Sequence, residues 1–336
     1  MKTIQTKCKN VNPLILIGES LRNINNYISE DRTIIVTDSN IIKYYNNLLP
    51  SCRIIELKPG ERTKNLKTIN FIIKKFIEYN VDRSYFILGI GGGVVCDITG
   101  FAASIYKRGV HFGFVATTLL AQADASIGGK NGVNFSSYKN IIGTINQPDF
   151  IISDIDMLKT LPKNEITNGF AEIIKHSLIA DEELFNMLER EYKNRYKHEF
   201  LEEVIYKSAL IKTGIVEKDE YENDLRRILN FGHTFGHAIE SGKKISHGRA
   251  ISIGMAKALD ISVFRNSICR NLSDRIKNLL KIYNLPTSVE TDERQLIDAI
   301  IKDKKKYSDK IKFILLEGIG KPIIEEISID ELIIYI

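Results

Sequence analysis

The chain of 336 residues has no tryptophan, only 4 cysteines and only 6 histidines. The cysteines (Cys8, Cys52, Cys96 and Cys269) lie far apart and form no CxxC pair, so we expect reduced thiols in a cytoplasmic protein and no disulfides. No apolar run approaches the roughly 18 residues of a membrane span, and the N-terminal MKTIQTKCKN lacks the apolar core of a signal peptide. A net charge of +5 is small for this length and gives little reason to expect nucleic acid, although it is compatible with an anionic small substrate.

The pattern of apolar residues changes part-way along the chain. Before Pro162, short β-branched runs alternate with helical spacing, which predicts a parallel sheet with helices on both faces. The predicted strands are 33–38, 53–58, 84–90, 112–117 and 149–153. Beyond Pro162, the predicted helices are 163–180, 182–214, 222–241, 249–265 and 272–283, with one strand at 311–317. We therefore expect an α/β Rossmann-like domain over 1–161 and a mainly α-helical domain over 162–336.

Three of the six histidines lie close together. HTFGH places His233 and His237 one helical turn apart, and His247 follows in SHGRA. The motif resembles that of zinc proteases, but Thr234 stands where their water-activating glutamate would be, so the pattern indicates a divalent metal without proteolysis. Gly236 is costly inside a helix, which predicts close packing against something, such as a cofactor.

A third candidate ligand lies in AEIIKH, where Glu172, Lys175 and His176 occupy neighbouring positions of a predicted helix. Glutamate and lysine three residues apart are ordinarily a surface ion pair. With the histidines in the same predicted domain, Glu172 completes a His/His/Glu set that suits a catalytic zinc. The spacing leaves open whether His237 or His247 is the second histidine ligand.

A glycine-rich turn follows the predicted strand 84–90 in GIGGGVVCD, at 89–97. Such a turn lets backbone N–H groups approach a phosphate at a helix N-terminus, although this match to GxGxxG is imperfect and tight turns alone explain many similar cases. Asp38 ends a predicted strand, where it could bind ribose hydroxyls or simply cap a helix. Lys130 stands in a polar, glycine-rich stretch over 119–134 that could be a mere connection, but its position suits an anion.

Many blocks of the sequence, in order, resemble the 3-dehydroquinate synthase family of the shikimate pathway. They are PGERTK (59–64), GGGVVCDITGFAAS (91–104), KRG (107–109), TTLLAQADASIGGKNGVN (117–134), KNIIGTINQP (139–148), LKTLP (158–162), GFAEIIKH (169–176), LNFGHTFGHAIE (229–240), HGRAISIGM (247–255) and DKK (303–305). The resemblance implies an NAD-binding α/β domain, a helical metal- and substrate-binding domain, and a homodimer.

The resemblance also implies roles for individual residues. The Zn²⁺ or Co²⁺ ligands would be Glu172, His233 and His247. NAD would contact Asp38, Asn40, Glu61, Lys64, Gly92, Gly93, Val94, Asp97, Thr117, Thr118, Lys130, Lys139 and Thr160. The catalytic residues would be Lys130, Lys175, Glu222, Asn230 and His237. The sugar phosphate would also contact Asp124, Asn140, Lys212, Arg226, Lys304 or Lys305, and Arg108 of the neighbouring subunit.

The reaction that the resemblance implies converts 3-deoxy-D-arabino-heptulosonate 7-phosphate to 3-dehydroquinate and phosphate. NAD would oxidise the C5 alcohol transiently, phosphate would leave by elimination and could itself act as the base, and re-reduction and an intramolecular aldol step would follow. The phosphate would be held by Lys130, Arg226, Asn140 and Arg108. Protons near the reacting hydroxyls would be relayed or stabilised by His237 and Asn230.

Two kinds of enzyme and one non-enzymatic class are alternatives. A metal-dependent NAD polyol dehydrogenase would not need the cations Lys130, Lys175, Lys212 and Arg226, whereas another sugar-phosphate cyclase would differ in its product. A metal- or nucleic-acid-binding module fits poorly with the small net charge. One departure from the family is Cys96, where glycine is usual, and it predicts strain only if its φ is positive.

Overall fold

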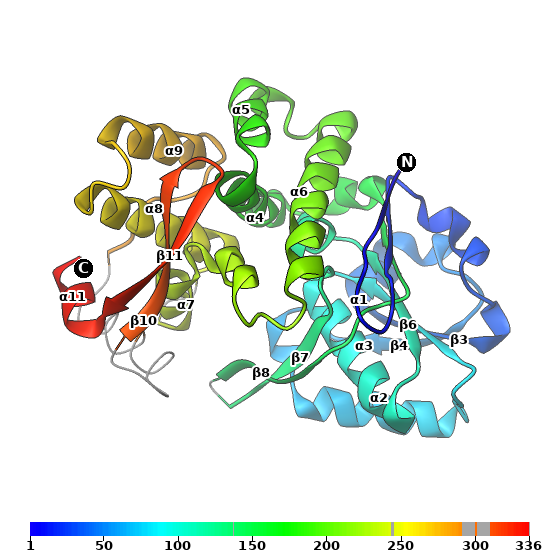
Figure 1. Ribbon diagram of the computed structural model, residues 1–336. Helices are drawn as coiled ribbons and strands as arrows, with labels where there is room; N and C mark the ends of the chain where they lie inside the picture. The colour runs from blue at the N-terminus through cyan, green and yellow to red at the C-terminus, as the bar shows by residue number, and fades with distance from the viewer. Residues whose placement is uncertain (137, 243–244, 291–299, 301–309, 336) are drawn as a thin grey trace. The chain divides into compact units, whose positions relative to one another are not determined.

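The computed structural model describes the chain except for residues 137, 243–244, 291–299, 301–309 and 336 (Figure 1). It divides into two compact units, 1–162 with 201–221 and 163–200 with 222–336. The predicted single boundary after residue 161 placed 201–221 in the second domain, whereas the structure groups this segment with the first unit. The N-terminal residues hold this segment in the first unit, because Lys2 forms an ion pair with Glu203 and the backbone N–H of Lys7 donates to Glu217 at 2.7 Å.

The first unit is built on a seven-stranded sheet, which confirms the predicted α/β class. Its strands, in spatial order, are β1 (Lys2–Gln5), β2 (Leu14–Ile17), β9 (Phe150–Ser153), β6 (His111–Ala116), β5 (Phe86–Gly91), β3 (Thr33–Asp38) and β4 (Arg53–Leu57). All neighbours are parallel except the edge pair β1–β2. The helices are α1 (Ser39–Tyr45), α2 (Leu66–Glu78), α3 (Gly93–Ile105) and most of α6 (His198–Lys218).

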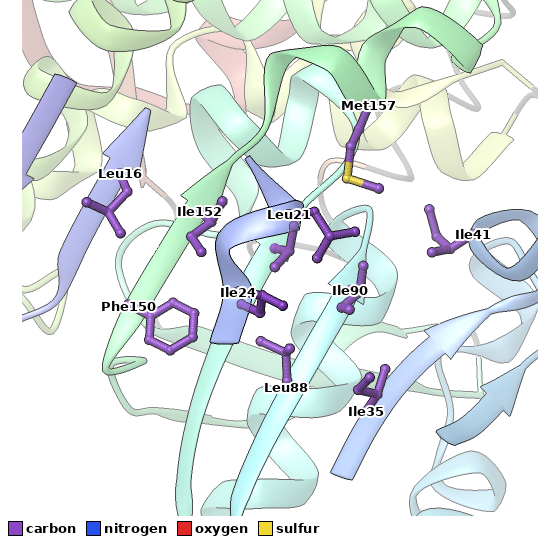
Figure 2. Packing of buried hydrophobic residues seen from close by; sticks show 11 residues of the cluster. Leu16, Leu21, Ile24, Ile35, Ile41, Leu88, Ile90, Phe150, Ile152 and Met157 are labelled. Atoms are coloured by element: carbon purple, nitrogen blue, oxygen red, sulfur yellow. The ribbon is translucent and has the colours of Figure 1, made fainter. Parts of the chain in front are cut away.

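Side chains from alternate strand positions form the core on one face of this sheet. Leu88 and Ile90 of β5 and Ile152 of β9 pack with residues of the short helices beside them, including Leu21 and Met157 (Figure 2). On the opposite face α3 lies close to β5, since a Cβ built on Gly89 would be 3.0 Å from the Thr99 hydroxyl.

The polar stretch 119–134, for which a mere connection was one interpretation, enters a β-hairpin at Lys130. Strands β7 (Lys130–Phe135) and β8 (Tyr138–Ile145) pair antiparallel beside α3 (Figure 1). Backbone approach explains the glycines, because a Cβ on Gly132 would be 2.7 Å from the carbonyl oxygen of Ile142. Sequence periodicity missed the hairpin because its burial does not alternate regularly.

The second unit is mainly helical, as predicted. It contains α4 (Lys163–Ala180), α5 (Glu182–Arg190), α7 (His233–Gly242), α8 (His247–Phe264), α9 (Arg270–Ile282), α11 (Ile329–Ile334) and the hairpin of β10 (Lys310–Gly318) and β11 (Lys321–Ser328). The predicted helix 182–214 is wrong, because α5 ends at Arg190 and α6 begins at His198. The predicted helix 222–241 is also wrong, because a short 3₁₀ helix (Leu225–Asn230) precedes Gly232, whose φ of 78° ends it before α7.

Among the helices in the described part of the chain, none is both long enough and apolar enough to cross a membrane.

Candidate metal and nucleotide sites

Close helix crossings at glycines bring the candidate metal ligands of the second unit together. A Cβ on Gly248 of α8 would be 2.5 Å from the Cα of Asn168 in α4, so these two helices touch through their backbones. Glu172 lies one turn beyond Asn168, and His247 precedes Gly248. Gly236 of α7 lies against α8, with its Cβ position 3.2 Å from the Cα of Ile251. The close packing predicted for Gly236 is therefore packing against a helix.

The carboxylate of Glu172 is the centre of this cluster. Its Oε1 lies 3.1 Å from Nε2 of His247 and 3.7 Å from Nε2 of His233. The Glu172 side chain is fully buried, whereas His233 and His247 keep 14% and 31% of their side-chain surface exposed. One atom from each of the three residues lies within 4.8 Å of the others, and an oxygen with two imidazole nitrogens is a donor set that zinc accepts.

Each histidine of the cluster has a partner for its other ring nitrogen. The Nδ1–H of His233 donates to the carbonyl oxygen of Phe231 at 3.2 Å, which turns Nε2 toward Glu172. His247 has its Nδ1 3.5 Å from Glu240. Sequence reasoning missed Glu240, although its place one turn beyond His237 in HTFGHAIE could have suggested it.

Burial and neighbouring charges set the protonation of these imidazoles in opposite directions. Burial, with Lys175 nearby, holds the pKa of His233 well below its usual range, so this ring is neutral and offers a lone pair. Burial also lowers the pKa of His247, but the hydrogen bonds to Glu172 and Glu240 outweigh that effect and raise it to about 9.

Other predicted substrate residues of this unit are buried or make polar contacts with one another and with Glu172. Lys175 is 2% exposed and forms an ion pair with Glu172. Asn230 donates from its amide to Glu222 at 2.7 Å, and Glu222 has a φ of 60°, which is uncommon for a residue with a side chain. Arg226 is 2% exposed, so this cation is held in the interior.

In the first unit, the glycine-rich turn connects β5 to α3 at the carboxyl edge of the sheet. A Cβ on Gly92 would be 2.8 Å from the Thr118 side chain, so a larger residue at this helix N-terminus would have to displace Thr118. Cys96 lies inside α3 and is not among the residues with positive φ, so the strain considered for it is not present.

A buried ion pair between Lys64 and Asp97 lies beside this turn. The Lys64 ammonium contacts the Asp97 carboxylate, with side-chain exposures of 6% and 17%. Burial raises the pKa of Asp97, while Lys64 lowers it. Asp38 accepts from the N–H of Asn40 at 2.8 Å and caps α1, and its burial raises its pKa.

Further predicted residues of the first unit form a second set of contacts. The Lys212 ammonium lies 2.8 Å from the Asp124 carboxylate and donates to the Asp124 carbonyl oxygen at 2.6 Å. The hydroxyls of Tyr45 and Thr160 are 2.8 Å apart. Lys130, Lys139 and Asn140 lie exposed on the β7–β8 hairpin.

Family models identify the chain. The model of the 3-dehydroquinate synthase N-terminal domain matches residues 54–168, and that of the 3-dehydroquinate synthase C-terminal domain matches 169–306. The chain belongs to the 3-dehydroquinate synthase family. A 3-dehydroquinate synthase of Ruminiclostridium cellulolyticum is 40% identical over 304 residues, covering 87% of this chain and 85% of that protein. One of Clostridium beijerinckii is 36% identical over 327 residues, with 94% and 93% covered.

Several solved structures resemble the chain over nearly its whole length. A 2-deoxy-scyllo-inosose synthase complexed with carbaglucose-6-phosphate, NAD⁺ and Co²⁺ is 27% identical with a TM-score of 0.88, covering 99% of this chain and 98% of that one. A 2-epi-5-epi-valiolone synthase of Streptomyces hygroscopicus with NAD⁺ and Zn²⁺ bound is 25% identical with a TM-score of 0.89, with 98% and 97% covered. An NADH-dependent butanol dehydrogenase of Thermotoga maritima, 14% identical with a TM-score of 0.69, shares the fold and covers 100% of this chain and 98% of its own.

The structure thus brings together several of the residues that resemblance to the 3-dehydroquinate synthase family singled out. The groups are Glu172 with Lys175, His233 and His247; Glu222 with Asn230; Lys64 with Asp97; and Lys212 with Asp124. Between His237 and His247, it is His247 that joins Glu172 and His233 in the cluster. Lys304 and Lys305 lie outside the described residues. The roles given to these residues stay predictions.

Proposed function

We propose that this chain is a 3-dehydroquinate synthase that converts 3-deoxy-D-arabino-heptulosonate 7-phosphate to 3-dehydroquinate and phosphate in the cytoplasm. It would be a carbon–oxygen lyase that acts on a phosphate ester. The observation that carries the proposal is the cluster of the buried Glu172 with His233 and His247, with Lys175 beside it, in a chain that belongs to this family. The fold is shared with a butanol dehydrogenase, so the fold alone does not favour a cyclase. The buried cations Lys175 and Arg226, however, suit an anionic substrate.

The metal site would be formed by Glu172, His233 and His247. Their chemistry fits the group, since a buried carboxylate and a neutral imidazole converge within metal-ligand range and a second imidazole is oriented by Glu240. A bound Zn²⁺ or Co²⁺, the ions named for the related cyclases, would supply a Lewis acid that lowers the pKa of a substrate hydroxyl. His237 would contact the substrate hydroxyls from the same face of α7.

NAD would bind at the carboxyl edge of the sheet. The glycines at the start of α3, Gly92 and Gly93, and the absence of an acidic side chain in its first turn fit the pyrophosphate. The cofactor would supply a transient hydride acceptor with no net redox change. Lys64, fixed by Asp97, and the capping Asp38 would line the same edge, together with Thr118.

The remaining side chains would bind the charges of the substrate and hold protons. Arg226, Lys130 and Asn140 would hold the phosphate as it leaves, because cations stabilise the charge that develops on its oxygens. Asn230 would present its carbonyl oxygen to a substrate hydroxyl, since its amide group donates to Glu222. Lys212, held by Asp124, would neutralise the carboxylate or the phosphate.

An assay of phosphate release tests this function. With heptulosonate phosphate, metal and NAD, we expect phosphate and 3-dehydroquinate in equal amounts and no accumulation of NADH. Removing the metal with a chelator should slow phosphate release by at least about 100-fold, since the metal contributes several kcal/mol, and Zn²⁺ or Co²⁺ should restore it. Release that needs neither NAD nor metal would contradict the proposal. Steady NADH formation without phosphate would favour a polyol dehydrogenase, and turnover of a different sugar phosphate would favour another cyclase.

We also propose a homodimer in which Arg108 acts in the active site of the partner subunit. Arg108 is exposed in a turn of left-handed residues, with φ of 47° at Lys107, 66° at Arg108 and 118° at Gly109. Arg83 holds this turn by donating to the Lys107 carbonyl oxygen at 2.9 Å. Strained residues that the surrounding structure fixes are concentrated at functional sites, which supports a role for the turn.

A subunit-mixing experiment tests the role of Arg108 across the dimer. Arg108→Ala and Glu172→Gln are each expected to be inactive, but their co-refolded mixture should regain about one quarter of the wild-type activity, because half of the random dimers are mixed and each has one intact site. A mixture of Glu172→Gln with His233→Gln is the control and should stay inactive, since both residues belong to one cluster. No recovery in the first mixture would place Arg108 in the site of its own subunit.

A further inference from the structure

Asn134 of β7 connects two segments that contain different predicted ligand contacts. Its side-chain Nδ2 donates to the Glu61 carboxylate at 2.7 Å, and its Oδ1 accepts from the backbone N–H of Asn140 at 2.9 Å. Glu61 is a predicted NAD contact, and Asn140 is a predicted substrate contact. The two ends of one carboxamide therefore hold the two segments at a fixed separation.

The backbone of Asn134 strengthens this connection. Its N–H donates to the carbonyl oxygen of Lys64 at 3.0 Å, and residues 65 and 134 form an isolated parallel bridge. Lys64 in turn forms the buried ion pair with Asp97. The 61–65 segment and the hairpin thus meet at Asn134 through both its main chain and its side chain.

The local backbone explains why a side chain connects these two segments. The register of the hairpin shifts between Val133 and Phe135, so Asn134 lies at a bulge, a feature that re-aims side chains and is common next to active sites. Asn140 has a φ of 52°, in the left-handed region, where asparagine is one of the few residues with a side chain that is found more often. The hydrogen bond from its N–H to Asn134 stabilises that conformation.

Asparagine is the residue that satisfies both partners. The Glu61 carboxylate and the N–H of Asn140 are both at the surface, and a carboxamide of this length offers a donor to the first and an acceptor to the second. Aspartate would keep the acceptor but place a second carboxylate against Glu61. Alanine would remove both bonds.

We propose that Asn134 is a positioning residue that couples nucleotide binding to phosphate binding, because it sets the conformation of Asn140 from the position of Glu61. The inference rests on the proposed function, which assigns NAD to Glu61 and the substrate phosphate to Asn140. When NAD fixes Glu61, the carboxamide of Asn134 is fixed, and Asn140 is held in its left-handed conformation. Binding of either ligand then favours binding of the other by the same factor.

Calorimetry on the metal-loaded protein measures this coupling, with inorganic phosphate as a probe that does not turn over. The dissociation constant of NAD is determined without phosphate and with saturating phosphate. In the wild type we expect phosphate to tighten NAD binding by about 5-fold or more. In Asn134→Asp and Asn134→Ala we expect that factor to fall close to one, with folding checked by thermal unfolding. Tyr138→Phe, on an exposed residue of the same hairpin, should leave the factor unchanged.

A donor–acceptor exchange separates positioning from simple hairpin stability. In the double variant Glu61→Gln with Asn134→Asp, the new amide can donate to the new carboxylate, which still accepts from Asn140. In this variant we expect the logarithm of the coupling factor to be at least half of the wild-type value. This expectation holds whatever the affinity of the variant for NAD alone. A coupling factor unchanged in Asn134→Asp, or no recovery in the double variant, would overturn the inference.

Measurements on the wild-type protein distinguish a failure of this inference from a failure of the proposed function. A wild-type protein that binds NAD and releases phosphate from heptulosonate phosphate, yet has a factor of one, overturns the role of Asn134 alone. A wild-type protein that binds no NAD overturns both.

Discussion

Glu172→Gln is expected to lose its metal and to lower kcat/KM for phosphate release by at least about 1000-fold, the effect of losing several kcal/mol of metal-dependent stabilisation. The carboxylate is the anionic member of the cluster, and its Oε1 lies 3.1 Å and 3.7 Å from the two imidazoles. An amide of the same shape keeps the packing but is neutral and binds a divalent cation weakly. The measurement is metal content after dialysis, by elemental analysis, together with the phosphate-release rate.

Burial of the Glu172–Lys175 pair complicates the same substitution. Removing one partner of a buried ion pair costs roughly 3–5 kcal/mol of folding free energy, so we expect Glu172→Gln to lower stability as well. His233→Gln removes a ligand and leaves that pair in place, so it should lose metal with a smaller effect on unfolding. Glu182→Gln, on an exposed residue of α5, is the matched control and should retain both metal and activity. Retention of full metal and full activity by Glu172→Gln and His233→Gln would reject the cluster as the metal site.

The sequence predicted structure best where the pattern of residues within one helix or strand is sufficient to recognise it. The parallel sheet was predicted because β-branched runs such as Thr33–Asp38 are buried on both faces of β3. His233 and Glu172 could be named as candidate metal ligands from motif and resemblance, since each lies on a helix whose spacing is regular. Sequence spacing could not choose between His237 and His247, because the choice depends on how α8 crosses α4 and α7.

Contacts between distant segments explain what sequence reasoning missed. Residues 201–221 join the first unit through ion pairs and hydrogen bonds such as Lys2 with Glu203, which no local pattern encodes. Asn134 gains its partners only because the β7–β8 hairpin forms next to the 61–65 segment. The break before α7 comes from the left-handed residue Gly232, inside a stretch whose apolar spacing otherwise favours one helix.

Gly254→Ala is expected to lower the stability of the second unit strongly. A Cβ on Gly254 of α8 would lie 1.9 Å from the carbonyl oxygen of Gly232 and 2.8 Å from the backbone nitrogen of Gly236. Both obstacles are backbone atoms, so no side-chain rotation can relieve the clash. Overpacking of this kind costs about 3 kcal/mol or more, which would lower the midpoint of thermal unfolding of this unit by roughly 6–12 °C.

Gly214→Ala is the matched control for this substitution. Gly214 also lies in a helix, α6, but among the described residues no atom is within 4 Å of a Cβ built there. Because alanine favours the helix, this variant should be more stable by about 0.5–1 kcal/mol. Equal unfolding midpoints for Gly254→Ala and the wild type would mean that α7 and α8 do not cross as closely as described.

The same crossing connects stability to metal binding. Gly232 directly precedes His233, and His247 is the first residue of α8, so a methyl group at Gly254 would displace one ligand relative to the other. We expect Gly254→Ala, assayed well below its unfolding midpoint, to bind Zn²⁺ at least about 10-fold more weakly, the scale on which metal sites respond to misplaced ligands. Competition with a chromogenic chelator measures the affinity, with Gly214→Ala as reference. A destabilised Gly254→Ala with unchanged zinc affinity would show that the cluster tolerates movement of α7, and that the glycines serve packing alone.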